Sequence, residues 1–182
     1  MPTKRKTWRE KLADDKDLPK VIRLDATAAK RWGGRTMVLP APREVDAVIR
    51  GIRKGRTATI NDLRAALAQK HGTETTCPIT TGIFSWIVAN AAMEDEAVGK
   101  KRITPWWRVL KSDGKLNPKF PGGIAEQARR LAVEGFILPA KARLSRKPEA
   151  CQPLAGGRGA EQRYPRSAVR GLSHRKAMPA PI

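Results

Sequence analysis

Apolar residues recur at helical spacing in the middle of the chain. The first such stripe follows Pro42, which suits the first turn of a helix because an N–H group there would have no partner inside the helix. Its apolar positions fall at i, i+3, i+4 and i+7 and are Val45, Val48, Ile49 and Ile52. This pattern predicts a helix that turns one apolar face toward a core and ends at Gly55.

A second helix is predicted between Thr59 and Gly72. Thr59 suits the N-cap position, and Asp62 stands three residues later, where it can complete a capping box. The side chains expected to face inward are Leu63, Ala66 and Leu67. We therefore expect a short helix that is joined to the next one by a loop.

A third helix is predicted from Pro78, and it is followed by a hairpin. The apolar face of this helix is expected to hold Ile79, Ile83, Trp86 and Ile87. After a polar break, residues 103–110 (ITPWWRVL) mix β-branched and aromatic residues, which favours a strand. Gly114 can then supply the positive φ of a hairpin turn at residues 112–114.

A last helix is predicted after Gly122 and Gly123, and it closes at Gly135. Its inward residues are expected to be Ile124, Ala128 and Leu131. Two short helices joined by a loop, then a hairpin and a further helix, follow the order of a winged helix-turn-helix domain. A small α+β domain of another topology fits the same pattern equally well, so the pattern leaves both folds open.

Charge, proline content and apolar periodicity divide the chain into three parts. Residues 37–136 hold the periodic patterns and carry 16 basic and 10 acidic side chains. Residues 1–36 form a basic extension with few clustered apolar positions, although Trp8 and Trp32 are candidates for packing against the domain. Residues 137–182 hold six prolines, 10 basic and 2 acidic residues, and they lack the apolar surface needed to offset the entropy of ordering. The prediction is an α+β domain with flexible basic N- and C-terminal tails.

The composition indicates what kind of partner to expect. There are 37 Lys and Arg against 17 Asp and Glu, and the formal charge of +20 favours a polyanion, although charge alone does not separate DNA from RNA or from an anionic membrane. No run of about twenty apolar residues is present to span a bilayer, and the basic N-terminus lacks the apolar core of a secretory signal. With only two cysteines, we expect a reducing, cytoplasmic (nucleoid-associated) location, no metal and no cofactor.

The block at residues 103–136, ITPWWRVLKSDGKLNPKFPGGIAEQARRLAVEGF, resembles the active-site segment of the alkylguanine-DNA alkyltransferases. In that family a Pro-Cys-His-Arg motif precedes a Gly-containing hairpin, a Gly-Gly step, an amphipathic helix and a closing Glu-Gly. Residues 54–68 (KGRTATINDLRAALA) resemble the first helix of its helix-turn-helix, and the similarity spans roughly residues 39–136. The resemblance implies a winged-helix domain that enters the minor groove of DNA and flips a damaged guanine into a pocket.

The chemistry of that family does not carry over to this chain. Trp106 stands at the position of the methyl-accepting cysteine and Trp107 at that of the neighbouring histidine, between Pro105 and Arg108. Glu134 matches the third member of the family's Cys-His-Glu relay, but it has no thiol to activate. Alkyl transfer needs a thiolate, and an indole is neither a nucleophile nor a base here. The resemblance therefore implies a protein that is not an enzyme.

A tryptophan at the cysteine position is typical of the alkyltransferase-like proteins, which bind alkylated guanine in DNA and hand the site to excision repair. The resemblance implies double-stranded DNA and nucleotide-excision-repair proteins as partners of a monomer that does not bind membranes. A flat indole can stack on an extruded base, which is worth about 1–3 kcal/mol. The residues expected around such a lesion pocket are Pro105, Trp106, Trp107, Arg108, Phe120, Gly122, Gly123 and Glu134.

Three positions concern the family's machinery for flipping bases. The arginine finger of the family falls at Pro78 or Thr81, and residues 71–99 contain no Lys or Arg at all. The family's phosphate-rotating tyrosine is replaced by Ile60, whereas Asn90 matches the hinge asparagine under one of two placements of the gap. The candidate DNA contacts are therefore hydroxyl, amide and basic side chains: Thr59, Thr80, Thr81, Asn90, Lys100, Lys101, Arg102, Lys111, Lys115 and Lys119.

Several of these features have plainer explanations. Neighbouring residues in a strand face opposite sides, so one of Trp106 and Trp107 is expected in the core, and the family position favours Trp106 as the one that lines the pocket. Residues 100–102 are either a phosphate contact or a solvated loop, and the three lysines around the turn at 112–114 are the better indication of nucleic acid. Three rivals stay open: an architectural or regulatory winged-helix protein with its tryptophans in the core, an RNA-binding or ribosome-associated protein, and an enzyme that uses Cys77.

Overall fold

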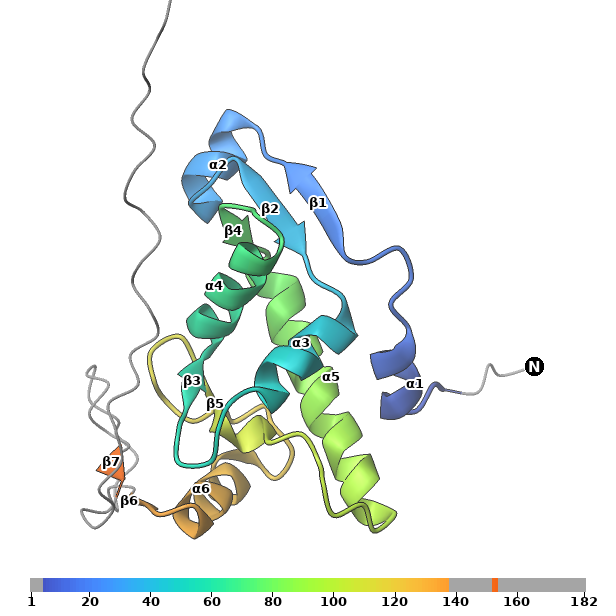
Figure 1. Cartoon of the computed structure of the whole chain (residues 1–182), viewed down its shortest axis with the longest axis vertical. Helices are drawn as coiled ribbons and strands as arrows, with labels where there is room; N and C mark the ends of the chain where they lie inside the picture. Colours follow the sequence, from blue (N-terminus) through green and yellow to red (C-terminus); the bar gives the residue numbers. More distant parts are fainter. Residues whose placement is uncertain (1–4, 138–151, 154–182) are drawn as a thin grey trace, which may run out of the picture.

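Helices dominate the fold, and the strands between them are short. The computed structural model describes residues 5–137 and 152–153, and in these residues it has a mixed α+β fold. The helices are α1 (Trp8–Ala13), α2 (Ala26–Trp32), α3 (Pro42–Arg50), α4 (Ile60–Lys70), α5 (Pro78–Ala97) and α6 (Gly123–Val133), with a 3₁₀ turn η1 at Trp106–Arg108 (Figure 1). The strands are β1 (Lys20–Arg23), β2 (Thr36–Leu39), β3 (Ala58–Thr59), β4 (Thr75–Thr76), β5 (Val109–Leu110), β6 (Phe136–Ile137) and β7 (Gln152–Pro153). The predicted α+β class is confirmed.

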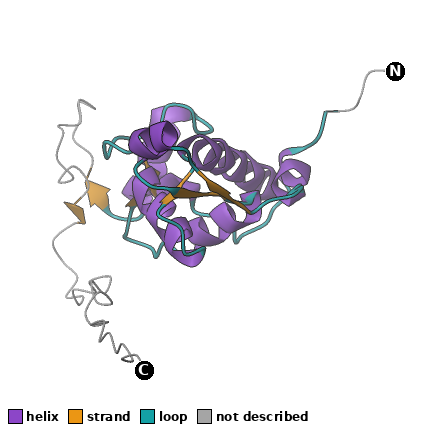
Figure 2. Ribbon diagram, turned by 90° about the horizontal axis from the view of Figure 1, so that it is seen from above, coloured by secondary structure: helices purple, strands orange, loops and turns teal. Residues whose placement is uncertain are grey.

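Helix α5 is the longest element, and the other helices are arranged around it. It contacts α1, α3, α4 and the turn η1, and the view from above shows the helices grouped in one body with the short strands among them (Figure 2). The core between these elements is built from buried apolar side chains that include Val45, Ile49, Leu63, Leu67 and Val88. Residues far apart in the sequence thus share one core.

The predicted starts of α3, α4 and α5 are confirmed. Thr59 and Asp62 form the expected capping box, in which the Thr59 N–H donates to Asp62 Oδ2 at 2.8 Å and the Asp62 N–H donates to Thr59 Oγ1 at 3.2 Å. Helix α3 begins at Pro42 as predicted, but it ends at Arg50 instead of continuing to Gly55. In α4 the prediction for Ala66 is wrong: Ala66 is exposed and Ala68 is buried.

The predicted inward face of α5 is wrong. Three of the four residues predicted to face inward point outward, with exposed fractions of 61% for Ile79, 49% for Ile83 and 39% for Trp86, and the fourth, Ile87, is half-buried. The buried side is made of small or hydroxyl residues: Thr81, Ser85, Val88, Ala89, Ala91 and Ala92. Thr81 and Ser85 can be buried because their hydroxyls donate to carbonyls one turn back, at 2.7 and 2.8 Å. Small side chains let α3 and α4 pack closely on α5, and the predicted apolar stripe of Ile79, Ile83 and Trp86 lies on the solvent side.

Residues 8–36 are not a tail but part of the folded body. Strand β1 pairs antiparallel with β2, with Lys20 opposite Leu39, and β2 pairs parallel with β4, which gives the three-stranded order β1-β2-β4. Helix α1 lies against α5, where the Glu94 carboxylate accepts the N–H groups of Trp8 and Arg9, each at 3.0 Å. The predicted boundary at residue 36 therefore does not separate a flexible extension from a domain.

The segment after α5 forms less sheet than predicted. Instead of a strand over 103–110, η1 is followed by the two-residue strand β5, which pairs parallel with β3. The turn at 112–114 is present: the Lys111 N–H donates to the Lys115 carbonyl at 2.8 Å, and Gly114 has a φ of 75°. Within the described residues no strand pairs with β5 across this turn, so the predicted hairpin is reduced to a short loop.

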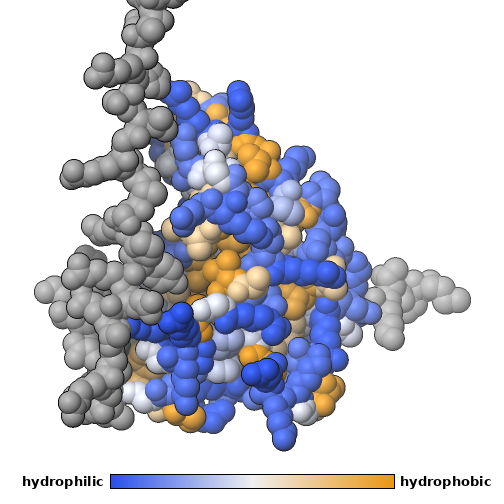
Figure 3. Space-filling view, in the orientation of Figure 1, coloured by the Kyte–Doolittle hydropathy of each residue, from blue (hydrophilic) through white to orange (hydrophobic). Residues whose placement is uncertain are grey.

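Helix α6 also differs from its predicted face. Leu131 is fully buried as expected, but Ile124 is exposed and Ala128 is half-buried. The prediction of disorder for 137–182 falls outside the described residues, apart from β6 and β7, which pair antiparallel. In the described ranges no helix is both long and apolar enough to cross a bilayer. The face seen in Figure 3 is mostly hydrophilic, with hydrophobic residues in separate patches.

Candidate nucleic-acid interface

The two tryptophans at 106 and 107 are placed by the 3₁₀ turn η1. The turn is closed by the Arg108 N–H, which donates to the Pro105 carbonyl at 3.1 Å. Trp106 is fully buried in the core between Phe120 and Trp107, with ring centroids 5.5 and 6.0 Å away in edge-on contacts. The prediction that Trp106 lines a pocket therefore does not hold in this structure, because its ring is enclosed by Phe120, Trp107 and the rest of the core.

Glu134 holds together three segments around these tryptophans. Its carboxylate accepts hydrogen bonds from Arg108 Nη2 at 2.8 Å, from Trp107 Nε1 at 2.7 Å and from the Gly55 N–H at 3.3 Å. The Arg108 and Glu134 side chains are 12% and 6% exposed, so this ion pair is almost buried. Burial by itself would raise the pKa of Glu134, but the hydrogen bonds from Arg108, Trp107 and Gly55 outweigh it and hold this pKa below its usual value. Glu134 is thus a structural clamp between η1, α6 and the loop after α3.

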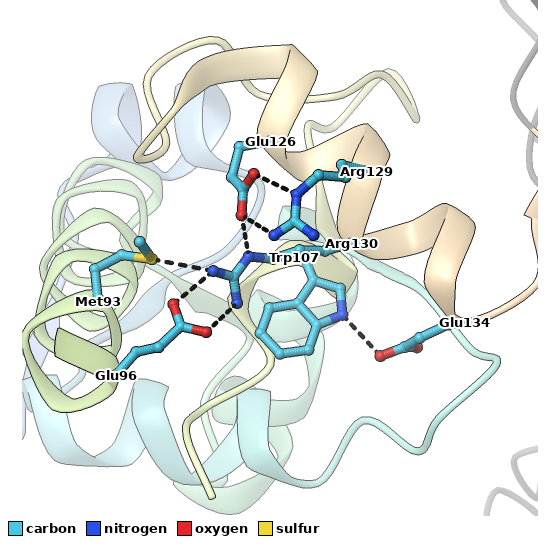
Figure 4. A network of polar contacts seen from close by, with 7 residues as sticks. All are labelled: Met93, Glu96, Trp107, Glu126, Arg129, Arg130 and Glu134. Carbon is cyan, nitrogen blue, oxygen red and sulfur yellow. Dashed lines mark hydrogen bonds and ion pairs between the residues drawn. The ribbon is translucent and has the colours of Figure 1, made fainter. Parts of the chain in front are cut away.

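Arg130 covers one face of the Trp107 ring. Its guanidinium lies 5.0 Å from the ring centre of Trp107 and 5.4 Å from that of Trp106. It is fixed by ion pairs to Glu126 and Glu96, both at 2.6 Å, and it donates to Met93 Sδ at 3.6 Å (Figure 4). The face of Trp107 next to Arg130 is therefore occupied and is not free to stack on a base.

Gln127 is a structural residue that the sequence-based interpretation missed. It is fully buried on α6, where its Nε2 donates to the carbonyls of Trp107 at 3.1 Å and Val109 at 2.7 Å. Its Oε1 accepts the Asn117 N–H at 2.7 Å, so the side-chain amide ties η1 and β5 to the loop after the turn. The available signal was its position on the stripe of Ile124, Ala128 and Leu131, where a polar residue at helical spacing indicates a buried polar contact.

An open pocket of about 190 Å³ lies between α4, α5 and the segment that follows η1. It is lined by Ile60, Gly82, Ser85, Val109, Leu110, Lys111, Ser112, Asn117 and Phe120. Of the eight residues predicted for a lesion pocket, Phe120 lines it. Pro105 is buried, and Gly122 and Gly123 instead form the start of α6, where they adopt φ values of 70° and 63°. The pocket is thus displaced from the tryptophans toward α5.

The hydroxyl and amide candidates for DNA contact are mostly used inside the protein. Thr59 caps α4, the Thr80 hydroxyl donates to the Cys77 carbonyl at 3.3 Å, and Asn90 Nδ2 donates to the Trp86 carbonyl at 2.8 Å. Thr81 is fully buried, so the prediction that it contacts DNA is wrong. Its burial follows from the close packing of α5 described above.

The basic candidates lie on two loops and differ in their partners. Lys100 is paired with Asp95 at 2.8 Å, whereas Lys101 and Arg102 are exposed. Lys111 and Lys115 flank Asp113 at 3.5 and 3.2 Å, and Lys119 is exposed at the far end of the same loop. Burial would raise the pKa of Asp113, but Lys115 and Lys111 hold it below its usual value. Lys111 also lines the pocket, so the structure brings the cationic turn and helix α5 to one surface.

Comparisons with family profiles, with curated proteins and with solved structures give no match to this chain. Within the described ranges, no three His, Cys, Asp or Glu side chains are grouped so that they hold a metal ion. The candidate site consists of a small, mostly apolar pocket, a neighbouring exposed helix face and a loop with three lysines.

Proposed function

We propose that this protein binds double-stranded DNA without altering it chemically. The binding surface is the N-terminal half of α5, the lysine loop at residues 111–119, and the pocket between them. The order α3, β3, α4, α5, β5 and turn is compatible with a winged helix-turn-helix in which α5 occupies the recognition-helix position. The loop at 111–119 then takes the position of a wing.

The observation that carries this proposal is the place of Lys111. Lys111 lines the pocket together with Gly82 and Ser85 of α5, so the cationic loop and the helix face the same partner. Lys119 is exposed on that loop, and the chain as a whole carries a formal charge of +20. Phosphate contacts by such lysines supply most of the affinity of a sequence-tolerant DNA-binding protein.

The pocket supports a finer proposal, namely that it takes an extruded, alkylated guanine. It has a volume of about 190 Å³ and lies between α5 and the lysine loop. Phe120, in place of either tryptophan, is the aromatic side chain available to a base there. Trp106 is buried at the position where the enzymes that the sequence resembles have a nucleophile, and the Glu134 carboxylate is occupied by Arg108 and Trp107. On this proposal a lesion is bound without transfer of its alkyl group. Nucleotide-excision-repair proteins are the partners that follow from this proposal.

A second candidate is an architectural DNA-binding protein that is indifferent to lesions. It is favoured by the burial of Trp106 and by the position of Arg130 over Trp107, because both tryptophans then serve the core. This protein would use the same helix face and the same lysines, without using the pocket.

The test compares the affinity for duplexes with and without one alkylated guanine, at two salt concentrations and with structured RNA as competitor. DNA binding predicts an affinity that falls as salt rises, and Lys119→Met is expected to lower the slope of log K against log salt by about 1. Lys30→Met, on α2 away from this loop, is the matched control and should leave the slope unchanged. Equal affinity for both duplexes would refute lesion recognition and support the architectural function. The absence of a salt slope, or a preference for RNA, would refute DNA binding.

A further inference from the structure

Strand β1 forms an open edge of the three-stranded sheet. The order β1-β2-β4 leaves one side of β1 without a neighbouring strand among the described residues, and Figure 1 shows β1 at the outer side of the sheet. An unpaired edge presents a row of backbone N–H and C=O groups, which is a template for a further strand. Val21, within this edge, has an apolar side chain that is 52% exposed. The edge therefore offers both backbone groups and apolar surface to a partner.

The register of the sheet determines which backbone groups of β1 point outward. The Leu24 N–H donates to the Arg35 carbonyl at 2.8 Å, one residue beyond the strand, so Leu24 turns its N–H toward β2. Along an antiparallel strand, residues alternate between those that exchange hydrogen bonds with the neighbouring strand and those that do not. Ile22, two residues before Leu24, therefore also faces β2, whereas the N–H and carbonyl groups of Val21 and Arg23 face the open edge.

Positive charge selects the kind of strand that this edge accepts. Lys20 and Arg23, the first and last residues of β1, are exposed, and residues 16–36 carry 6 basic and 2 acidic side chains. Two copies of β1 paired antiparallel and in register would set Lys20 of one opposite Arg23 of the other, and like charges directly opposite each other are destabilising. Exposed Lys on an edge strand also keeps uncharged strands away. An acidic strand is attracted by the same two side chains.

We propose that β1 binds an extended acidic segment of a partner protein, which adds to the sheet as a fourth strand. In such β-strand addition, main-chain hydrogen bonds give affinity and the side chains of the added strand give specificity. Side chains directly opposite each other across a strand pair lie on the same face, so the complement of β1 has an acidic residue at each end and apolar residues in the middle. A nucleic acid has the negative charge but lacks the N–H and C=O groups that the outward groups of Val21 and Arg23 require.

The proposed docking edge is separate from the proposed DNA surface. Strands β1 and β4 are the two outer strands of the sheet, and it is β4 that leads into α5. A partner strand on β1 therefore leaves α5 and the lysine loop at residues 111–119 free for a duplex. The inference goes beyond the proposed DNA binding and does not rest on it.

The probe for this edge is a short peptide with a Glu-Val-Val-Glu core between threonines, and the control peptide has Lys in place of both Glu residues. Each peptide is titrated into the full chain, and amide hydrogen exchange is followed residue by residue with NMR. In the free protein, the Ile22 amide is expected to be protected from exchange and the Val21 and Arg23 amides to exchange freely. The acidic peptide should protect these two amides as well, and the Lys peptide should not.

Two variants test the charge and the backbone groups of the edge. Lys20→Glu/Arg23→Glu is expected to weaken binding of the acidic peptide about tenfold and to favour the Lys peptide, because both cross-strand charge pairs change sign. Lys101→Glu/Arg102→Glu makes the same change of charge on an exposed loop and is the matched control, which should bind as wild type does. Val21→Pro should abolish peptide binding and keep the circular dichroism spectrum, because proline is tolerated in an edge strand where the N–H faces away from the sheet.

The opposite results each overturn the addition of an acidic strand. They are failure of wild type to bind the acidic peptide, protection without the alternation along β1, and wild-type affinity in the charge-reversed variant or in Val21→Pro. If a DNA duplex displaces the peptide, the edge is a nucleic-acid site instead. If the Val21 and Arg23 amides are protected in the free protein and lose this protection on dilution, a second copy of the chain occupies the edge. Failure of duplex binding alone would refute the proposed function and leave this inference standing.

Discussion

The substitution Glu134→Gln tests whether the carboxylate at this position is a clamp. It removes the charge that faces Arg108 and leaves Arg108 and Trp107 competing for a single carbonyl oxygen. The Arg108 and Glu134 side chains are 12% and 6% exposed, and removing one partner of such a buried pair costs about 3–5 kcal/mol. Because Gln keeps the shape and one acceptor, we expect a loss near the lower end, about 3 kcal/mol of the free energy of unfolding.

The assay is urea unfolding followed by circular dichroism, with Arg129→Gln as the control. Arg129 also pairs with a carboxylate, Glu126, but its side chain is 63% exposed, so solvent screens this pair and its loss should cost much less than the loss of Glu134. A double-mutant cycle of Glu134→Gln with Arg108→Gln should give a coupling energy of about 1.5 kcal/mol or more. If Glu134→Gln costs no more than Arg129→Gln, or if the cycle shows no coupling, the clamp interpretation is refuted.

Three further substitutions test the site, and one of them is read as a pH profile. Trp106→Ala should lower the free energy of unfolding by about 3–5 kcal/mol in urea denaturation, as expected for a fully buried tryptophan; a folded protein of unchanged stability would contradict its place in the core. Gln127→Leu should lower the free energy of unfolding by about 2–4 kcal/mol in the same assay, because the Trp107 and Val109 carbonyls and the Asn117 N–H lose their partner. Unchanged stability would show that the side-chain amide is dispensable. The pKa of Glu126 is lowered by hydrogen bonds from Arg129 and Arg130 from the usual 4.5 to about 2. Its contribution to stability is therefore complete above pH 4.5 and is lost as pH falls toward 2. Between these two pH values the melting temperature of Glu126→Gln should depend less on pH than that of the wild type. The same pH dependence of the melting temperature in both proteins would contradict this.

Local signals predicted the starts of the helices well. Pro42, the Thr59–Asp62 capping box and Pro78 each act within one turn of the chain, so their effect can be read from a few neighbouring residues. The turn at Gly114 belongs to the same class, because its positive φ favours glycine whatever surrounds it.

The outer side of α5 and the place of Trp106 depended on packing that the sequence pattern does not contain. In α5 the helix stripe was read from its largest apolar residues, whereas close contact with α3 and α4 selects the small side, Thr81 and Ser85 included. Residues 106–108 have strand-like composition but follow Pro105 into a 3₁₀ turn, which buries Trp106 and turns Trp107 toward Glu134. Tertiary contacts overrode local preference at both positions.

The N-terminal segment was missed because its stabilising partners are distant in the sequence. Strand β1 pairs with β2, and β2 pairs with β4 at residues 75–76. No local sequence pattern predicts this pairing between distant segments. The two N–H groups at the start of α1 are accepted by Glu94, more than eighty residues away. The packing of α5 also depends on this segment, since Trp8 contacts Trp86 with ring centres 4.5 Å apart.

The most direct test of the central claim is to map amide chemical-shift changes of the full chain during titration with a short duplex. Binding through the proposed surface predicts changes concentrated in residues 78–86 and 111–119, with the β1–β2 strands unaffected. Changes confined to the sheet and α2, or no changes at saturating duplex in low salt, would contradict the account.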